Sequence, residues 1–268
     1  MTKMKAAMIG FLPQGADPFP VLESYAKIGY TAFEGGDVLF KGDVKENLKR
    51  VHDFGMEPLS LHWGGNEDVD VNAIIEKAHT IGVKQVTNYC GVAGAYRFHN
   101  GNPFPTMDLL LREAEKFEKF AQALKKEGLT FCFHNHDAEF VHYVDERPVI
   151  DIMLENAPTM KMEVDVGWVT YAGCDPVAFM KSLGDRFYAL HVKDFTLGHV
   201  ARVDGSPASM PRFTTPGTGV LKLAECLKTA SEMGITHAIV EQDFQYNLTQ
   251  LETLTAAYYN MKETGYVL

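Results

Sequence analysis

The sequence has little cysteine, no cluster of basic residues and no long apolar run. Its four cysteines are far apart and form no CxxC pair, which argues against a zinc ribbon or a redox dithiol and is typical of a reducing compartment: Cys90, Cys132, Cys174 and Cys226. No apolar run approaches the roughly 20 residues that a membrane-spanning helix needs. The amino terminus has no small-residue cleavage site of the kind found in signal peptides. We therefore expect a cytoplasmic protein with no membrane partner.

Positive charge is also scarce. The chain carries 25 basic and 35 acidic residues, a formal net charge of −10. A protein that binds a nucleic-acid backbone needs a basic surface, and this balance would repel phosphate. We expect a small molecule, and no nucleic acid, as the partner.

The glycine-rich turn of a dinucleotide-binding sheet is missing. The turn after the first predicted strand reads LPQGA (12–16) and lacks the GxGxxG pattern. This disfavours a doubly wound open sheet.

Short β-rich segments alternate with longer amphipathic segments along the chain. Such alternation predicts parallel strands joined by right-handed helical crossovers. Eight units in 268 residues predict a single-domain α/β fold over residues 1–268, a (β/α)8 TIM barrel. A stretch rich in Gly, Pro, Ser and Thr, residues 195–218, is expected to form an irregular loop over the barrel mouth. The predicted strands are 6–11, 32–34, 58–63, 83–89, 130–136, 161–165, 188–193 and 238–243, and the predicted helices are 18–28, 44–54, 71–81, 106–126, 149–155, 176–182, 221–233 and 248–261.

Titratable residues stand at the carboxyl ends of the last four predicted strands. These ends meet on one face of a barrel, where TIM-barrel enzymes carry their active sites. His134, Asp165, His191 and Glu241 would therefore converge there. Mixed nitrogen and oxygen donors suit Mn²⁺, Co²⁺, Zn²⁺ or Fe²⁺. An ion at this point would polarise a carbonyl and acidify the adjacent C–H.

Several of these residues have alternative interpretations. His136 is two residues after His134, so both would point to the same side of the strand, and His136 could replace His134 as a ligand. Glu163 points into the barrel one layer below Asp165 and could pair with a buried lysine or histidine. Lys193 and Asp194 could form a local ion pair.

Four segments in order carry a family resemblance. The chain resembles the sugar phosphate isomerase/epimerase-type proteins of the xylose isomerase-like TIM barrel superfamily (AP endonuclease family 2-like). Relatives bind one Mn²⁺-like ion through Glu, Asp, His and Glu at the ends of strands five to eight, and the last three positions fall on Asp165, His191 and Glu241. The resemblance therefore implies a divalent metal, first Mn²⁺, with Co²⁺, Zn²⁺ or Mg²⁺ as alternatives. The four segments are HNHDAEF (134–140), EVDVGWVTYAGCDP (163–176), LHVKDF (190–195) and IVEQDF (239–244).

Two positions depart from the family pattern. His134 stands where ketose epimerases carry a glutamate that exchanges protons with the substrate, which leaves Glu241 as the sole carboxylate of that pair. Trp168 stands where epimerases and endonuclease IV have a histidine, and its flat indole would stack on a sugar ring.

The resemblance implies a metal-dependent isomerase or epimerase acting on a small sugar, keto-sugar or polyol derivative. We expect Glu241 to act as base and ligand, His134 as ligand or second base, and Lys193 as a stabiliser of oxyanion charge. The alternatives are an inosose dehydratase-like or keto-glycoside lyase reaction, or a non-catalytic sugar-binding barrel. Relatives often form dimers or tetramers, and no feature of the sequence fixes whether this chain is a homo-oligomer. The residues expected to bind substrate are His62, His136, Trp168 and Glu34.

Overall fold

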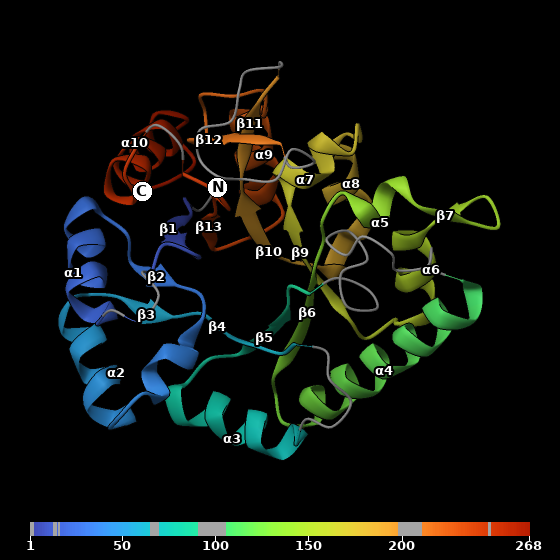
Figure 1. The fold of residues 1–268 in the computed structure, drawn as a ribbon, viewed down its shortest axis with the longest axis horizontal. Coiled ribbons are helices and arrows are strands. Elements are labelled where there is room, and N and C mark those ends of the chain that lie inside the picture. Colours follow the sequence, from blue (N-terminus) through green and yellow to red (C-terminus); the bar gives the residue numbers. More distant parts are fainter. Residues whose placement is uncertain are drawn as a thin grey trace.

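Parallel strands form one nearly closed barrel in the computed structural model, which describes residues 3–12, 15, 17–64, 70–90, 106–197, 211–245 and 248–268 (Figure 1). In these ranges the nine-stranded sheet runs in the order β3-β2-β1-β13-β10-β9-β6-β5-β4. The predicted TIM barrel is confirmed. The strands are β1 (Lys5–Met8), β2 (Ala32–Phe33), β3 (Glu57–Pro58), β4 (Ser60–His62), β5 (Gln85–Asn88), β6 (Thr130–His134), β9 (Lys161–Asp165), β10 (Phe187–Val192) and β13 (His237–Val240).

The third predicted strand closes the barrel by changing partners in its middle. β3 pairs with β2, and β4, one residue further on, pairs with β5. The two ends of the strand order are therefore consecutive pieces of one chain segment. This break at Leu59 joins the sheet into a cylinder.

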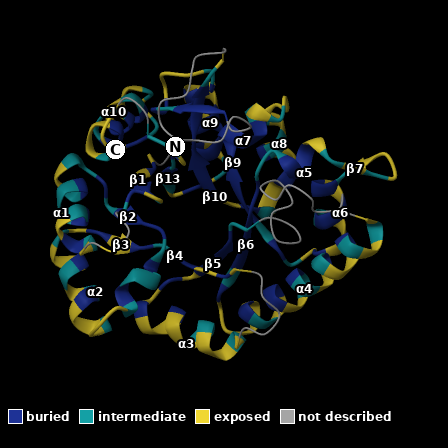
Figure 2. Ribbon diagram, viewed as in Figure 1, coloured by how far each residue is buried: buried dark blue, intermediate teal, exposed yellow. Residues whose placement is uncertain are grey.

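Helices surround the barrel and turn their buried sides toward it (Figure 2). In α4 the predicted stripe Leu110, Ala114, Phe117, Ala121 and Leu124 is buried. A helix with one apolar face gains most of its stability from covering a sheet in this way. The crossover helices are α1 (Pro18–Ile28), α2 (Val44–Asp53), α3 (Val71–Ile81), α4 (Met107–Lys126), α6 (Val149–Asn156), α8 (Pro176–Leu183), α9 (Leu223–Glu232) and α10 (Gln250–Glu263).

Local signals set where these helices begin and end. Asp175 caps α8, since its side chain accepts a hydrogen bond from the Val177 backbone N–H at 2.9 Å, and Pro176 fits the first helical position. Gly82 ends α3 with a φ of 76°, a conformation that glycine adopts without strain. The predicted boundaries hold to within about two residues for these reasons.

The structure corrects the prediction of a wholly irregular segment over 195–218. β11 (Asp194–Thr196) pairs antiparallel with β12 (Arg212–Thr214), with Asp194 opposite Thr214. Residues 198–210 of the predicted loop lie outside the described residues. The pairing depends on contacts between segments distant in sequence, which local composition does not report.

Further short elements lie between the strands and the outer helices and were not predicted. They are α5 (Ala138–Val141), α7 (Val166–Tyr171), the hairpin of β7 (Tyr143–Val144) and β8 (Arg147–Pro148), and the 3-10 turns η1 (Gly36–Phe40) and η2 (Gly184–Arg186).

None of the helices in the described part of the chain combines the length and apolar character that crossing a bilayer requires.

The barrel interior is apolar in its lower part and polar above. Ala7, Ala32, Ala189 and Ile239 form a small buried cluster separate from the main core, which lies between the strands and the helices. Side chains alternate along each strand, so the inward position two residues after Ala189 is His191 and the one two residues after Ile239 is Glu241. At these two positions the titratable side chains lie one layer above the small residues, whereas Glu163 on β9 is level with Ala189.

Candidate metal centre and active site

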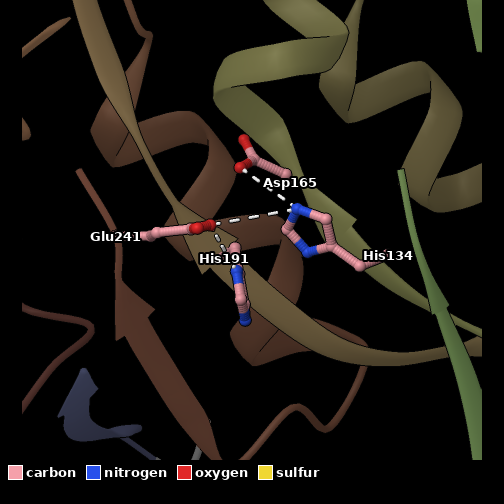
Figure 3. Close-up of side chains that lie close together, drawn as sticks. All are labelled: His134, Asp165, His191 and Glu241. Atoms are coloured by element: carbon pink, nitrogen blue, oxygen red, sulfur yellow. Dashed lines mark hydrogen bonds and ion pairs between the residues drawn. The ribbon is translucent and has the colours of Figure 1, made fainter. Parts of the chain in front are cut away.

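Four side chains from neighbouring strands converge at the carboxyl end of the barrel (Figure 3). His134 ends β6, Asp165 ends β9, His191 lies in β10 and Glu241 follows β13. One donor atom from each lies within 4.8 Å of one from every other. His134 Nε2 is 3.8 Å from Asp165 Oδ2 and 3.9 Å from Glu241 Oε2, and His191 Nδ1 is 2.9 Å from Glu241 Oε2. Of the two histidines that the sequence left open, His134 is the one in this cluster.

The turn after β9 aims the Asp165 carboxylate. Its Oδ1 accepts the Trp168 backbone N–H at 2.9 Å and so caps α7, which leaves Oδ2 directed at the cluster. Gly167 allows α7 to lie against the end of β10, because a Cβ there would stand 2.4 Å from the Lys193 carbonyl oxygen. Asn135 fixes the strand ends by exchanging hydrogen bonds with the Asp165 backbone.

Lys193 binds three carboxylates with its ammonium group. Its Nζ lies 3.2 Å from Asp165 Oδ2, 3.1 Å from Glu241 Oε2 and 2.8 Å from Asp243 Oδ2. Burial alone would lower the pKa of Lys193, but the three carboxylates outweigh it and raise that pKa. The same contact, with His191, holds the pKa of Glu241 well below its usual range although burial opposes this. Glu241 is therefore ionised at neutral pH.

The local ion pair considered between Lys193 and Asp194 does not form. Asp194 turns the other way and accepts four backbone N–H groups, those of Phe195, Gly217, Gly219 and Leu221, at 2.9 to 3.0 Å. Successive strand residues point to opposite faces, so these two side chains cannot meet.

A second layer of carboxylates lies directly beneath the cluster. Glu163 Oε1 is 3.2 Å from His134 Nδ1 and 3.1 Å from His191 Nε2. Glu163 therefore pairs with buried histidines, one of the alternatives considered from the sequence. Glu34 Oε2 is 2.6 Å from His191 Nε2. Burial and the nearby Glu34 raise the pKa of Glu163 to about 8. Glu34, expected to bind substrate, is instead buried in this layer and contacts a histidine.

The rim of the site contains His62, His136 and Tyr89. The His136 ring is centred 5.0 Å from that of His134, and the His62 ring stacks on Tyr89 at 4.8 Å. Tyr89 was not predicted as a site residue. Its ring packs edge-on against His134 at 5.8 Å, and burial raises its pKa, with contributions from Glu34, Glu163 and Glu241. The sequence could have indicated Tyr89, because residues two apart on a strand point to the same side and Tyr89 follows Gln85 and Thr87 in this pattern.

Trp168 does not offer an open stacking surface. Only 1% of the residue is exposed, and its indole packs edge-on against Phe213 with centroids 5.3 Å apart. The Lys193 ammonium lies over the indole at 4.8 Å. The ring forms part of the wall that encloses Lys193, which differs from the expected role as a sugar platform.

The chemistry and geometry of these donors fit a divalent cation. Ligands about 2.1 Å from one ion lie roughly 3 to 4 Å from each other. Three of the donor pairs are 2.9 to 3.9 Å apart, and all four donors lie within 4.8 Å of one another. Five carboxyl groups surround this largely buried site. Three contact Lys193 and the other two contact His191, so acidic groups outnumber basic ones there. Asp165 Oδ2 accepts no hydrogen bond from the described residues and meets only ionic partners. The carboxylates are Glu34, Glu163, Asp165, Glu241 and Asp243.

Most of the chain matches one known protein family. Residues 22–257 match the family described as xylose isomerase-like TIM barrel. A search of curated proteins finds no significant match.

Solved structures share the fold at low sequence identity. A sugar phosphate isomerase/epimerase from Parabacteroides distasonis superposes with a TM-score of 0.71 at 21% identity, over 98% of this chain and 96% of that one. D-psicose 3-epimerase with D-tagatose, from Clostridium cellulolyticum, gives 0.68 at 14% identity, over 97% and 99%. The IOLI protein with a zinc atom gives 0.72 at 16% identity, over 98% and 99%.

Proposed function

Because the chain belongs to the xylose isomerase-like TIM barrel family, we propose that it is a metal-dependent isomerase or epimerase of a small sugar, keto-sugar or polyol derivative. One observation carries this proposal: the donor atoms of His134, Asp165, His191 and Glu241 lie within 4.8 Å of one another at the active-site end of the barrel. The similar structures that are named as sugar isomerases or epimerases support the reaction class.

The four clustered residues would hold the metal. A divalent cation bound there would polarise a substrate carbonyl and make the adjacent C–H more acidic. Mn²⁺ is our first choice, with Co²⁺, Zn²⁺ and Mg²⁺ as alternatives, because the donor set mixes imidazole and carboxylate.

Glu241 is the base in this proposal. Its side chain is 19% exposed, whereas those of His134, Asp165 and His191 are at most 1% exposed, so Glu241 is the member of the cluster that faces the opening. Its lowered pKa keeps it in the carboxylate form at neutral pH.

Lys193 acts on the base in this proposal. Its ammonium lies 2.8 to 3.2 Å from three carboxylates, and this contact would hold Glu241 charged and in place. His62, His136 and Tyr89 line the rim, where imidazole and phenol groups can bind the hydroxyls of a polyol.

Two measurements test the proposal. Purified protein would first be analysed for bound metal, then incubated in deuterated water with a panel of keto-sugars and Mn²⁺. We expect stoichiometric metal and deuterium at the carbon next to the carbonyl. Glu241→Gln, which keeps the size of the side chain, is expected to lower the exchange rate at least about 100-fold.

A protein that binds these sugars but incorporates no deuterium would be a non-catalytic sugar-binding barrel. A protein that retains no divalent ion would contradict the metal dependence.

A further inference from the structure

The two histidines of the cluster present different ring nitrogens to it. His134 directs Nε2 toward Asp165 and Glu241, whereas His191 directs Nδ1 toward Glu241. The other nitrogen of each ring meets a carboxylate from the layer below. His134 Nδ1 faces Glu163, and His191 Nε2 faces both Glu34 and Glu163. Each ring is therefore held between two carboxylate layers.

A buried amide fixes the lower carboxylates in turn. Gln85 Nε2 donates to Glu34 Oε1 at 3.0 Å and also to Glu163 Oε2. Thr87 adds a hydrogen bond to Glu163 Oε2 at 3.3 Å. All four side chains are buried. Desolvating two carboxylates is costly, and the interior of a barrel is ordinarily filled by branched apolar residues.

We propose that Glu34 and Glu163, held by Gln85, are positioning residues that select the tautomer and ring orientation of the two histidines. A neutral imidazole has one N–H and one lone pair. A carboxyl oxygen that accepts the N–H at one nitrogen leaves the lone pair on the other. Glu163 thus directs the Nε2 lone pair of His134 into the cluster, and Glu34 and Glu163 together direct the Nδ1 lone pair of His191. This role rests on the proposed metal dependence.

The contacts make the effect of each residue different. Glu163 Oε1 contacts both histidines, at 3.2 and 3.1 Å, whereas Glu34 contacts only His191 of the two. Loss of Glu163 should therefore disturb both ligands and loss of Glu34 only one.

The full-length protein would be titrated with Mn²⁺, Co²⁺ and Zn²⁺ in competition with a chromophoric chelator. We expect Glu163→Leu to weaken affinity about 100-fold and Glu34→Leu about 10-fold, since outer partners of metal-bound histidines are worth roughly 10- to 100-fold. Glu163→Gln and Glu34→Gln remove the charge but keep an oxygen acceptor, so each should recover most of the loss. Glu57→Gln, half-exposed at the opposite end of the barrel, is the matched control and should bind as the wild type does.

A nitrogen NMR measurement of histidine tautomers separates this role from a structural one. In the Zn²⁺-bound wild type we expect the proton of His134 on Nδ1 and that of His191 on Nε2, with both assignments disturbed in Glu163→Leu. Urea denaturation of the metal-free variants shows which of them fold. Glu163→Leu removes a partner from the buried groups of Gln85, His134 and His191 and should lower stability, whereas Glu163→Gln keeps an oxygen acceptor and should lower it less.

Three results would be decisive against the idea. Equal losses in the Gln and Leu variants would mean that only charge matters, and wild-type affinity or unchanged tautomers in Glu163→Leu would overturn the positioning role alone. A wild-type protein that binds none of the three ions would remove the proposed function as well.

Discussion

At the scale of single residues, Lys193 shows how a buried charge organises the site. Its ammonium neutralises part of a largely buried cluster of carboxylates and lies over the rings of Trp168 and Phe213. Burying one charge without a partner costs several kcal/mol. The arrangement is stable because the lysine and the carboxylates are desolvated together.

Lys193→Met should therefore destabilise the metal-free protein strongly. The change leaves Asp165 and Glu241 buried without their cation, and we expect the free energy of unfolding to fall by about 3 to 5 kcal/mol. Urea denaturation at neutral pH measures this. Lys49→Met is the control, because Lys49 forms an exposed pair with Asp53 and should change stability by less than about 0.5 kcal/mol. Equal effects of the two substitutions would contradict the role given to Lys193.

At the scale of elements, the strand ends depend on short segments anchored by side-chain hydrogen bonds. α7 begins on Asp165 itself, so a candidate metal ligand is also a helix cap. Asp194 begins β11, and its carboxylate accepts three backbone N–H groups from the turn that follows β12. Gly219 is required in that turn, because a Cβ would stand 2.3 Å from Asp194 Oδ1. The segment next to the site is thus fixed by one carboxylate.

Asp194→Ala should release this anchor. The backbone N–H groups of Gly217, Gly219 and Leu221 would lose their acceptor, at about 1 to 3 kcal/mol for each donor that stays buried. We expect a loss of about 3 kcal/mol in urea denaturation and faster hydrogen exchange at these amides. Asp194→Asn keeps one oxygen acceptor and should lose less. Unchanged exchange at Gly219 in the alanine variant would show that another group holds the turn.

At the scale of the whole molecule, the barrel brings together residues spread over positions 134 to 241 of the chain. His134, Asp165, His191 and Glu241 come from four neighbouring strands whose carboxyl ends share one face (Figures 1 and 3). A cation bound between four strands would link their positions, and it would bind the folded chain far better than the unfolded one. Metal binding should therefore stabilise the entire fold.

Metal removal should lower the melting temperature. An ion at 100 times its dissociation constant contributes about 2.7 kcal/mol, which corresponds to a shift of roughly 5 to 10 °C in a chain of this size. Thermal unfolding of chelator-treated protein with and without Mn²⁺ measures the difference. Asp165→Ala, which removes one donor, should abolish most of the shift. A shift of equal size in this variant would place the ion elsewhere.

Much of the fold follows from local patterns that the sequence displays. The stripe on α4 and the Asp175–Pro176 start of α8 depend on neighbours in the chain, so both were predicted. α7, β11 and β12 were missed because their partners are distant: α7 lies against Lys193, and β11 pairs with a strand 16 to 20 residues away. The burial of Trp168 and Glu34 was not predicted for the same reason, because the groups that cover them are distant in the sequence.

The sequence by itself determined the barrel, the strand order and the face on which Asp165, His191 and Glu241 would meet, because period, parity and parallel connections are local or topological properties. Only the tertiary structure decided that His134 and not His136 joins them, that Lys193 faces three carboxylates, and that Glu34 and Glu163 lie beneath both histidines. The reason is physical. The alternation of side chains along a strand shows to which side each one points. Hydrogen-bond partners depend on differences of a few tenths of an ångström in how the strands lie, which the sequence does not give.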